Sequence, residues 1–157
     1  MWIGYDDVKS SPTYFYVQRS SNFNQLNVPI PFDVERLNVG GAMNSASGKF
    51  TAPVAGKYFF SLSGLTDIPA SPNRLVLQIS LYKNGGIIAN SYTDAITNSA
   101  QRETFSLQST LELKSGDQIW LQITEISSGA YVWGNYYTHF NGFLLQENIS
   151  QVVTTLQ

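Results

Sequence analysis

The chain has 157 residues, which suits one domain with a buried core, and only 13% of them are charged. The formal net charge of −2 gives no electrostatic reason to expect nucleic acid or an anionic membrane as a partner. Because cysteine is absent, neither a disulfide framework nor a thiol nucleophile is available. No apolar run approaches the ~20 residues that a membrane-spanning helix requires, so we expect no membrane insertion.

The first third of the chain predicts a leader and then short extended pieces. Residues 1–12 lack periodicity, and we interpret them as a leader. They show no signal-peptide pattern, which suits an excised domain or a cytosolic protein. Residues 14–17 predict a strand with apolar side chains on both faces. Two prolines limit residues 28–32 to an edge or irregular extended piece, and glycine-containing turns follow within 39–48.

Residues 48–62 predict a sharp turn followed by a strand at the centre of a sheet. Pro53 cannot donate to a β-ladder and Gly56 tolerates unusual backbone angles, so the chain turns between the two short runs that flank them. Successive side chains of a strand point to opposite faces. One face therefore carries Tyr58, Phe60 and Leu62, and the other carries Lys57, Phe59 and Ser61. Aromatic residues on both faces favour a central position.

The second half of the chain alternates apolar and polar residues in segments separated by turns. The predicted strands cover residues 75–82, 87–92, 104–113, 118–124 and 136–146. Asn84–Gly85 is the strongest hairpin signal, because both residues accept positive φ. No segment of helical length carries an apolar stripe. The sequence therefore predicts an all-β chain of about ten strands, as a sandwich or a barrel.

Several motifs, in this order, resemble the globular head of complement C1q and its relatives. The residues at the family's spacing are Phe32, Asn38, Phe50, Gly56, Tyr58 and Phe60. Two positions differ, since Met43 stands where an aromatic residue or Leu is usual and Leu62 where Phe or Tyr is. The resemblance continues through Leu81–Gly85, Lys114–Leu121 and Phe140–Leu145, and it covers residues 13–147.

The resemblance implies a fold, an assembly and a location. Members of that family form a ten-stranded jelly-roll β-sandwich, similar to tumour necrosis factor, that assembles as a homotrimer. We therefore expect a C1q-like globular domain over residues 13–147 and a C-terminal tail over 148–157. The resemblance also implies a secreted, extracellular protein.

Strands with two apolar faces indicate assembly independently of the resemblance. A strand in a two-sheet sandwich needs only one apolar face. The second face must meet either a symmetric partner or loops and long side chains of the same chain. We expect the trimer interface to include Tyr14, Tyr16, Phe59 and Phe140.

The sequence does not indicate an enzyme. His139 is the single histidine, and no nearby Ser, Cys or Asp spacing makes it the base of a triad or a zinc ligand. The glycine pairs Gly40–Gly41 and Gly85–Gly86 do not open helices, so they do not form a phosphate-binding loop.

Calcium is the only cofactor that the resemblance suggests. Several relatives bind it near the threefold axis, through acidic and amide oxygens in the loop ahead of the Gly-Asp-Gln motif. Asp94 and Glu103 fall close to those positions, with Asn98 or Gln101 as further oxygen donors. The alternative is a solvated polar loop without a metal.

Residues 127–137 form an aromatic-rich loop ahead of the last strand. Trp and Tyr rings beside amide and hydroxyl groups suit a sugar ring or a protein partner, so Tyr131, Trp133 and Asn135 are candidate ligand-binding residues. Packing within a trimer is the alternative. Asn148–Ser150 is a glycan acceptor tripeptide, which matters only in a secreted protein.

The leading functional hypothesis is a secreted homotrimeric recognition module that binds a protein, glycan or lipid target through avidity, as in innate-immune pattern recognition. The alternatives are a receptor-activating ligand of the tumour necrosis factor type and a structural extracellular trimerising cap.

Overall fold

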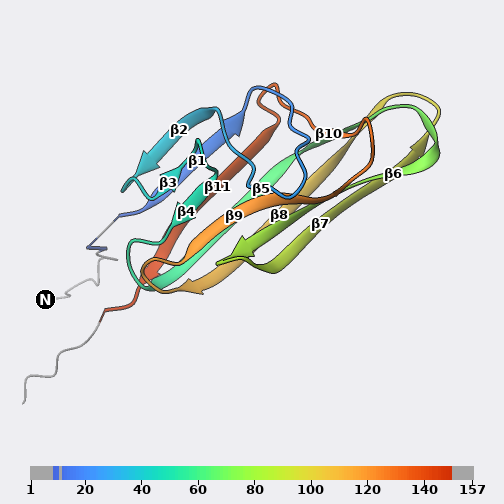
Figure 1. Ribbon diagram of the computed structural model, residues 1–157. Coiled ribbons are helices and arrows are strands. Elements are labelled where there is room, and N and C mark those ends of the chain that lie inside the picture. The colour runs from blue at the N-terminus through green and yellow to red at the C-terminus, as the bar shows by residue number, and fades with distance from the viewer. Residues whose placement is uncertain (1–8, 11, 150–157) are drawn as a thin grey trace, which may run out of the picture.

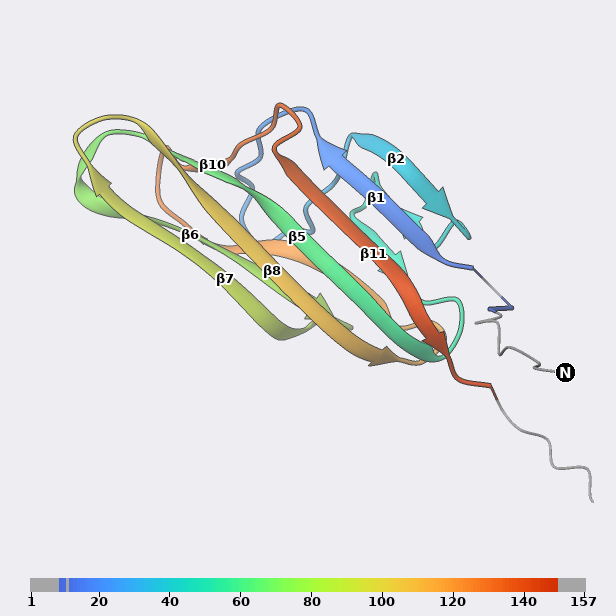
Figure 2. The same ribbon diagram turned by 180° about the vertical axis from the view of Figure 1, so that it is seen from behind.

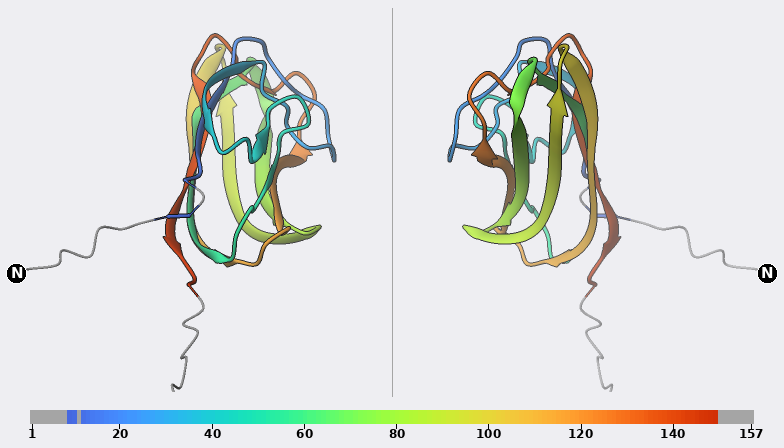
Figure 3. Two further views of the ribbon diagram at one scale, coloured as in Figure 1. Left: turned by 90° about the vertical axis from the view of Figure 1, so that its left-hand side faces the viewer. Right: turned by 90° about the vertical axis from the view of Figure 1, so that its right-hand side faces the viewer.

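A computed structural model describes residues 9, 10 and 12–149 of the chain, which fold into two β-sheets packed face to face (Figures 1 and 3). The strands are β1 (Tyr14–Arg19), β2 (Val34–Val39), β3 (Met43–Asn44), β4 (Lys49–Thr51), β5 (Gly56–Ile68), β6 (Ser71–Lys83), β7 (Gly86–Thr97), β8 (Gln101–Leu113), β9 (Gln118–Ile126), β10 (Tyr131–Val132) and β11 (Thr138–Glu147). No helix in this part of the chain is long and apolar enough to cross a membrane.

The strand order is that of a jelly-roll sandwich. Sheet A contains β8, β5, β11, β1 and β2 side by side, as Figure 2 shows from behind, and β10 continues along β5 beyond the end of β11. Sheet B has the order β3-β4-β9-β6-β7. All of these strand pairs are antiparallel. The described chain begins and ends at one end of the sandwich, where the Ser10 backbone N–H donates to Glu147 Oε2 at 2.8 Å.

The predicted turn and central strand are confirmed. β4 ends at Thr51, β5 begins at Gly56, and β5 pairs with β8 on one edge and with β11 on the other. Burial alternates along β5, and Tyr58 and Phe60 are completely buried. Position 56 requires glycine because the backbone of β11 lies very close to it. A Cβ at this position would overlap with the backbone carbonyl oxygen of Gln146 on β11.

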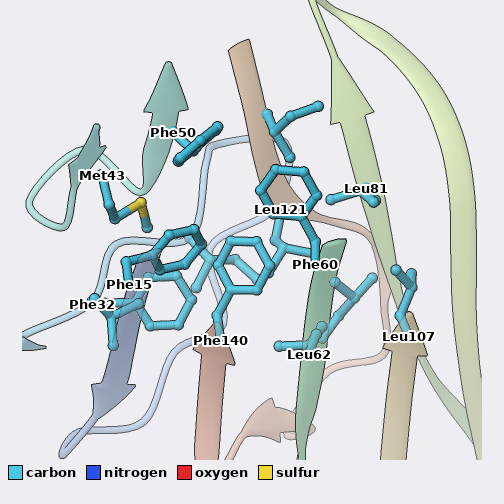
Figure 4. Close-up of a cluster of buried hydrophobic side chains, with 14 of the residues drawn as sticks. Phe15, Phe32, Met43, Phe50, Phe60, Leu62, Leu81, Leu107, Leu121 and Phe140 are labelled. Carbon is cyan, nitrogen blue, oxygen red and sulfur yellow. The ribbon is translucent and has the colours of Figure 1, made fainter. Parts of the chain in front are cut away.

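Aromatic rings from both sheets form the centre of the core (Figure 4). The Phe50 ring comes from sheet B, and its centroid lies 5.2 Å from that of Phe60 and 5.6 Å from that of Tyr58, both on sheet A. The edge-to-face geometry of these pairs adds to the gain from burial. The Tyr58 hydroxyl donates to the Val54 carbonyl at 2.7 Å, so its polar end is satisfied within the β4–β5 turn.

Several predicted boundaries change in the structure. The Asn84–Gly85 hairpin is confirmed, with φ of 51° and 90°, but the strands on either side of it are longer than predicted. The last strand begins at Thr138, because residues 134–137 form a turn. β2 was not predicted. It is the edge strand of sheet A and mostly exposed, so it has no clear apolar alternation to recognise.

Candidate functional site: the outer face of sheet A and its aromatic loop

The outer face of sheet A carries a row of aromatic side chains. Phe143 on β11 lies opposite Tyr14 of β1 and opposite Phe59 of β5, so the three form one row across the strands. The ring centroids of Phe59 and Phe143 are 5.3 Å apart. Tyr14 is 42% exposed and Phe143 is 37% exposed. Large apolar groups that gather on a solvent-facing sheet mark a surface that meets another molecule.

The next row has Tyr16 beside the exposed Leu37 of β2. The Tyr16 ring also meets the edge of His139, at 5.7 Å between centroids. Three of the four residues predicted for the assembly interface, Tyr14, Tyr16 and Phe59, thus share this face. We call this surface the aromatic face; it consists of Tyr14, Tyr16, Leu37, Phe59, His139 and Phe143.

The fourth residue, Phe140, is not on this face, and its prediction as an interface residue is wrong. It is 1% exposed and packs inside the sandwich against Phe15 and Phe32, at 5.1 and 5.9 Å between centroids. Phe140 lies opposite Leu62, an inward-facing residue of β5, so alternation along β11 turns His139 outward and Phe140 inward.

His139 has no catalytic surroundings in the described residues. Its cross-strand neighbours are Ser63 of β5 and Gln18 of β1, and no carboxylate orients its ring. The described part of the chain also contains no group of three His, Asp or Glu side chains that could hold a metal.

The aromatic loop after β9 is tied to sheet A through Asp67 of β5. Tyr131 of β10 and Arg102 of β8 lie opposite Asp67 on its two sides. Arg102 Nε is 3.1 Å from Asp67 Oδ1. The hydrogen bond from the Tyr131 hydroxyl to Asp67 raises the pKa of Tyr131. The loop therefore has a fixed position at the end of the sandwich away from the chain termini.

Trp133 has no open ring face. The Arg102 guanidinium carbon lies 3.7 Å from its ring centroid, and the Tyr137 ring stacks on it at 4.3 Å with an interplanar angle of 10°. Two groups at such short distances from one ring centre must lie on opposite faces of that ring. A sugar could not stack on Trp133 without displacing one of them, so the exposed rings of this loop are those of Tyr136 and Tyr137.

The turn that presents these tyrosines has an unusual backbone. The Tyr137 N–H donates to the Gly134 carbonyl at 3.1 Å, and the two residues between them, Asn135 and Tyr136, have φ of 51° and 65°. These values define a type I′ turn with a tyrosine where glycine is usual. The Arg36 guanidinium lies 5.6 Å from the Tyr136 ring centroid. Strained positions of this kind persist where the surroundings enforce them, and they are frequent at functional sites.

The structure does not bring the two predicted calcium ligands together. Asp94 lies opposite Val76 on the outer side of sheet B, and its carboxylate forms an ion pair with Arg74. Glu103 lies opposite the buried Thr66 on the inner side of sheet A, and it accepts a hydrogen bond from Gln101 Nε2 at 2.9 Å. The two carboxylates thus project from different sheets to different sides, and calcium binding stays a prediction.

The predicted glycan acceptor lies at the boundary of the described residues. Asn148 is exposed, and its Nδ2 donates to Glu112 Oε1 at 3.2 Å, while Ser150 lies outside the described residues. The Asn148 side chain is accessible, and glycosylation stays a prediction.

Comparison with known proteins finds many relatives. Caprin-2 of Danio rerio is 32% identical over 136 residues, which are 85% of this chain and 14% of that protein. Complement C1q tumor necrosis factor-related protein 2 of Mus musculus is 33% identical over 83% of this chain and 42% of its own length. Complement C1q and tumor necrosis factor-related protein 9B of Homo sapiens is 36% identical over 80% of this chain and 35% of its own length. The chain thus spans less than half the length of these relatives.

Solved structures support the fold. The globular domain of zebrafish complement 1qA protein aligns with a TM-score of 0.63 at 21% identity, covering 87% of this chain and 99% of that one. Eiger TNF from S. frugiperda aligns with a TM-score of 0.64 at 9% identity, covering 90% and 97%. The sequence model of the C1q domain family matches residues 14–145, which is nearly the whole sandwich. The chain belongs to the C1q domain family.

Proposed function

We propose that this protein is a secreted, homotrimeric recognition module that holds its target through avidity. The observation that carries the proposal is the row of Tyr14, Phe143 and Phe59 across sheet A. Aromatic groups on a solvent-facing sheet gain free energy when another protein surface covers them, at roughly 25 cal/mol per Å² of apolar surface. Membership of the C1q domain family supports a second copy of the chain as that surface, and also supports secretion.

A trimer would present three copies of each surface loop on one rigid body. Three weak contacts to a repeated target bind together far more tightly than one contact, because the second and third are intramolecular. The aromatic loop suits such a contact. The Tyr137 side chain is exposed and stacks on Trp133, and Trp133 in turn contacts Arg102. Tyr131, Trp133 and Asn135 would then shape the contact from within the loop. The target class is a protein, a glycan or a lipid.

Light scattering of the purified chain tests the assembly. We expect about three times the chain mass of 17.4 kDa. Phe143→Arg and Tyr14→Arg place a charge within the proposed interface, and each should yield a folded monomer. Ile88→Arg, at a comparably exposed apolar position on sheet B, is the matched control and should remain trimeric. A monomeric parent protein, or trimers of both arginine variants, would contradict the proposal.

A glycan and protein array probed with the trimer tests recognition. A target found in this way should bind the Tyr137→Ala trimer more weakly than the parent trimer. An unchanged affinity for Tyr137→Ala would exclude the aromatic loop as the contact, whatever the assembly state.

A further inference from the structure

The outer face of sheet B carries uncharged polar side chains on its middle strands. Ser80 on β6 lies opposite Asn90 of β7 and opposite Gln122 of β9. One row further along, Gln78 of β6 lies opposite Tyr92 of β7. This surface is on the side of the sandwich opposite the aromatic face, so the proposed assembly would leave it open.

A chain of hydrogen bonds fixes two amides on this surface. The Ser80 hydroxyl donates to Asn90 Oδ1 at 2.6 Å and lies 2.7 Å from Thr124 Oγ1. Gln78 Nε2 donates to Thr124 Oγ1 at 3.0 Å. Ser80 is 0% exposed, although it points away from the core, because larger side chains surround it. A partly buried, satisfied network of this kind favours one orientation of its members.

The network leaves one donor and one acceptor available. Because Asn90 uses its oxygen to accept from Ser80, its Nδ2 group is free to donate. Because Gln78 uses its nitrogen to donate to Thr124, its Oε1 atom is free to accept. Within the described residues neither atom has another protein partner. They stand on neighbouring strands in adjacent rows, on a diagonal of the sheet, where residues are about 7–8 Å apart.

Tyr92 adds an open aromatic surface next to these two groups. It is directly opposite Gln78 and 51% exposed, and its ring makes no aromatic or cation contact in the described part of the chain. Trp120 and Tyr82 differ, since they stack on each other at 5.5 Å and Lys49 lies 4.6 Å from the Trp120 ring centroid. Tyr92 is thus the ring on this face that a ligand can stack against.

The charges around this surface disfavour an acidic ligand. Asp94 is paired with Arg74, and Lys49 lies against Trp120. Glu125, opposite Gln78 on β9, is exposed and has no ion pair among the described residues, so its negative charge faces the same solvent as the two amides. The described residues around the two amides therefore offer no cluster of free cations to a sulfated or carboxylated ligand, whereas a neutral hydroxylated ligand needs none.

We propose that the outer face of sheet B binds a neutral hexose-containing glycan chain. The apolar side of one sugar ring stacks on Tyr92, Asn90 Nδ2 donates to a sugar hydroxyl, and Gln78 Oε1 accepts from another hydroxyl of the chain. A hydroxyl both donates and accepts, so two hydroxyls of a sugar chain complement this fixed donor and acceptor. The inference rests on the proposed role as a recognition module and adds a second contact surface to it, with its own ligand class.

Binding of the full chain to immobilised yeast mannan, laminarin and galactan tests this proposal, with heparin as the acidic comparison. At least one neutral polymer should bind, and heparin should not. Tyr92→Ala and Asn90→Asp should each weaken binding at least about tenfold. Asn90→Asp keeps the shape and the acceptor for Ser80 but replaces the free donor with a charged acceptor. Tyr92→Phe keeps the ring and should bind like the parent.

Light scattering on the same samples separates the two proposals. A trimer that binds none of the three neutral polymers, or whose binding is unchanged in Tyr92→Ala and Asn90→Asp, overturns the glycan inference alone. If the protein is monomeric and binds a neutral polymer, and both variants abolish that binding, only the assembly proposal is overturned.

Discussion

The Arg102 guanidinium carbon lies 3.7 Å from the centre of the Trp133 ring, and this contact joins the edge strand β8 to the loop that follows β10. Arg102 is in turn held by Asp67 of β5. The three residues come from three separate parts of the chain. The aromatic loop therefore depends on the tertiary structure for its shape, and its tryptophan is a packed residue that supports the exposed Tyr137.

The first prediction compares this packed tryptophan with a core aromatic residue. Phe60→Ala should cost ~3–5 kcal/mol of unfolding free energy, through lost transfer energy and the cavity left behind. Trp133→Ala should cost about 1–3 kcal/mol, because it removes one cation–π contact and one stacked pair at a partly exposed site. Chemical denaturation of both variants measures the two values. A loss in Trp133→Ala as large as that in Phe60→Ala would show that the loop is part of the core.

The second prediction concerns the type I′ turn. Tyr136 has φ of 65°, where a residue with a Cβ costs roughly 1–2 kcal/mol relative to glycine. Tyr136→Gly should therefore be more stable than Tyr136→Ala by about 1 kcal/mol, although glycine normally destabilises relative to alanine. Thermal unfolding of the two variants checks the order. A more stable alanine variant would mean that the turn relaxes and stores no strain.

The third prediction uses two glycines in strands. A Cβ at Gly56 would overlap with the Gln146 carbonyl, and backbone of a paired strand cannot move aside cheaply. Gly56→Ala should therefore lower the unfolding free energy by about 2 kcal/mol or more. Gly86→Ala is the matched control, because its Cβ would lie an ordinary 3.6 Å from the Lys83 carbonyl oxygen, and it should change stability by less than about 0.5 kcal/mol. Equal effects would disprove the close approach at β11.

The fourth prediction concerns acid stability. The Lys114 backbone N–H and then the Asn84 side chain donate to Asp117, and these bonds lower the pKa of its carboxyl. A carboxyl with a lower pKa in the folded state stabilises the fold above its unfolded pKa of about 3.9, and this stabilisation is lost as pH falls through the folded pKa. Asp117→Asn should therefore reduce stability near neutral pH and flatten its decline below about pH 4.

Melting temperatures of the parent and of Asp117→Asn between neutral and strongly acidic pH measure this effect. Asn84→Gly removes one of the two donors and tolerates the positive φ of this turn, so the pH dependence of its stability should lie between those of the parent and Asp117→Asn. Parallel profiles for the parent and Asp117→Asn would show that Asp117 makes no contribution to acid sensitivity.

The local features of this fold could be predicted from short stretches of sequence. Alternation places Tyr58 and Phe60 on one face of β5, and Asn84–Gly85 specifies a tight hairpin because both residues accept positive φ. The ordered motifs identify the family, and they include the core residues Phe50, Tyr58 and Phe60. These features need only the geometry of one strand or one turn.

The faces and neighbours of the functional residues were decided by the tertiary structure. Alternation divides β11 into two sets of side chains, but only pairing with β5 shows that Phe140 faces the core and Phe143 faces outward. The sequence predicts Trp133 as an exposed loop residue, whereas in the structure Arg102 of β8 covers one face of its ring. Asp94 and Glu103 are close in sequence, but they belong to strands of different sheets. Such relationships depend on strand register and on contacts between distant segments, which a one-dimensional pattern does not contain.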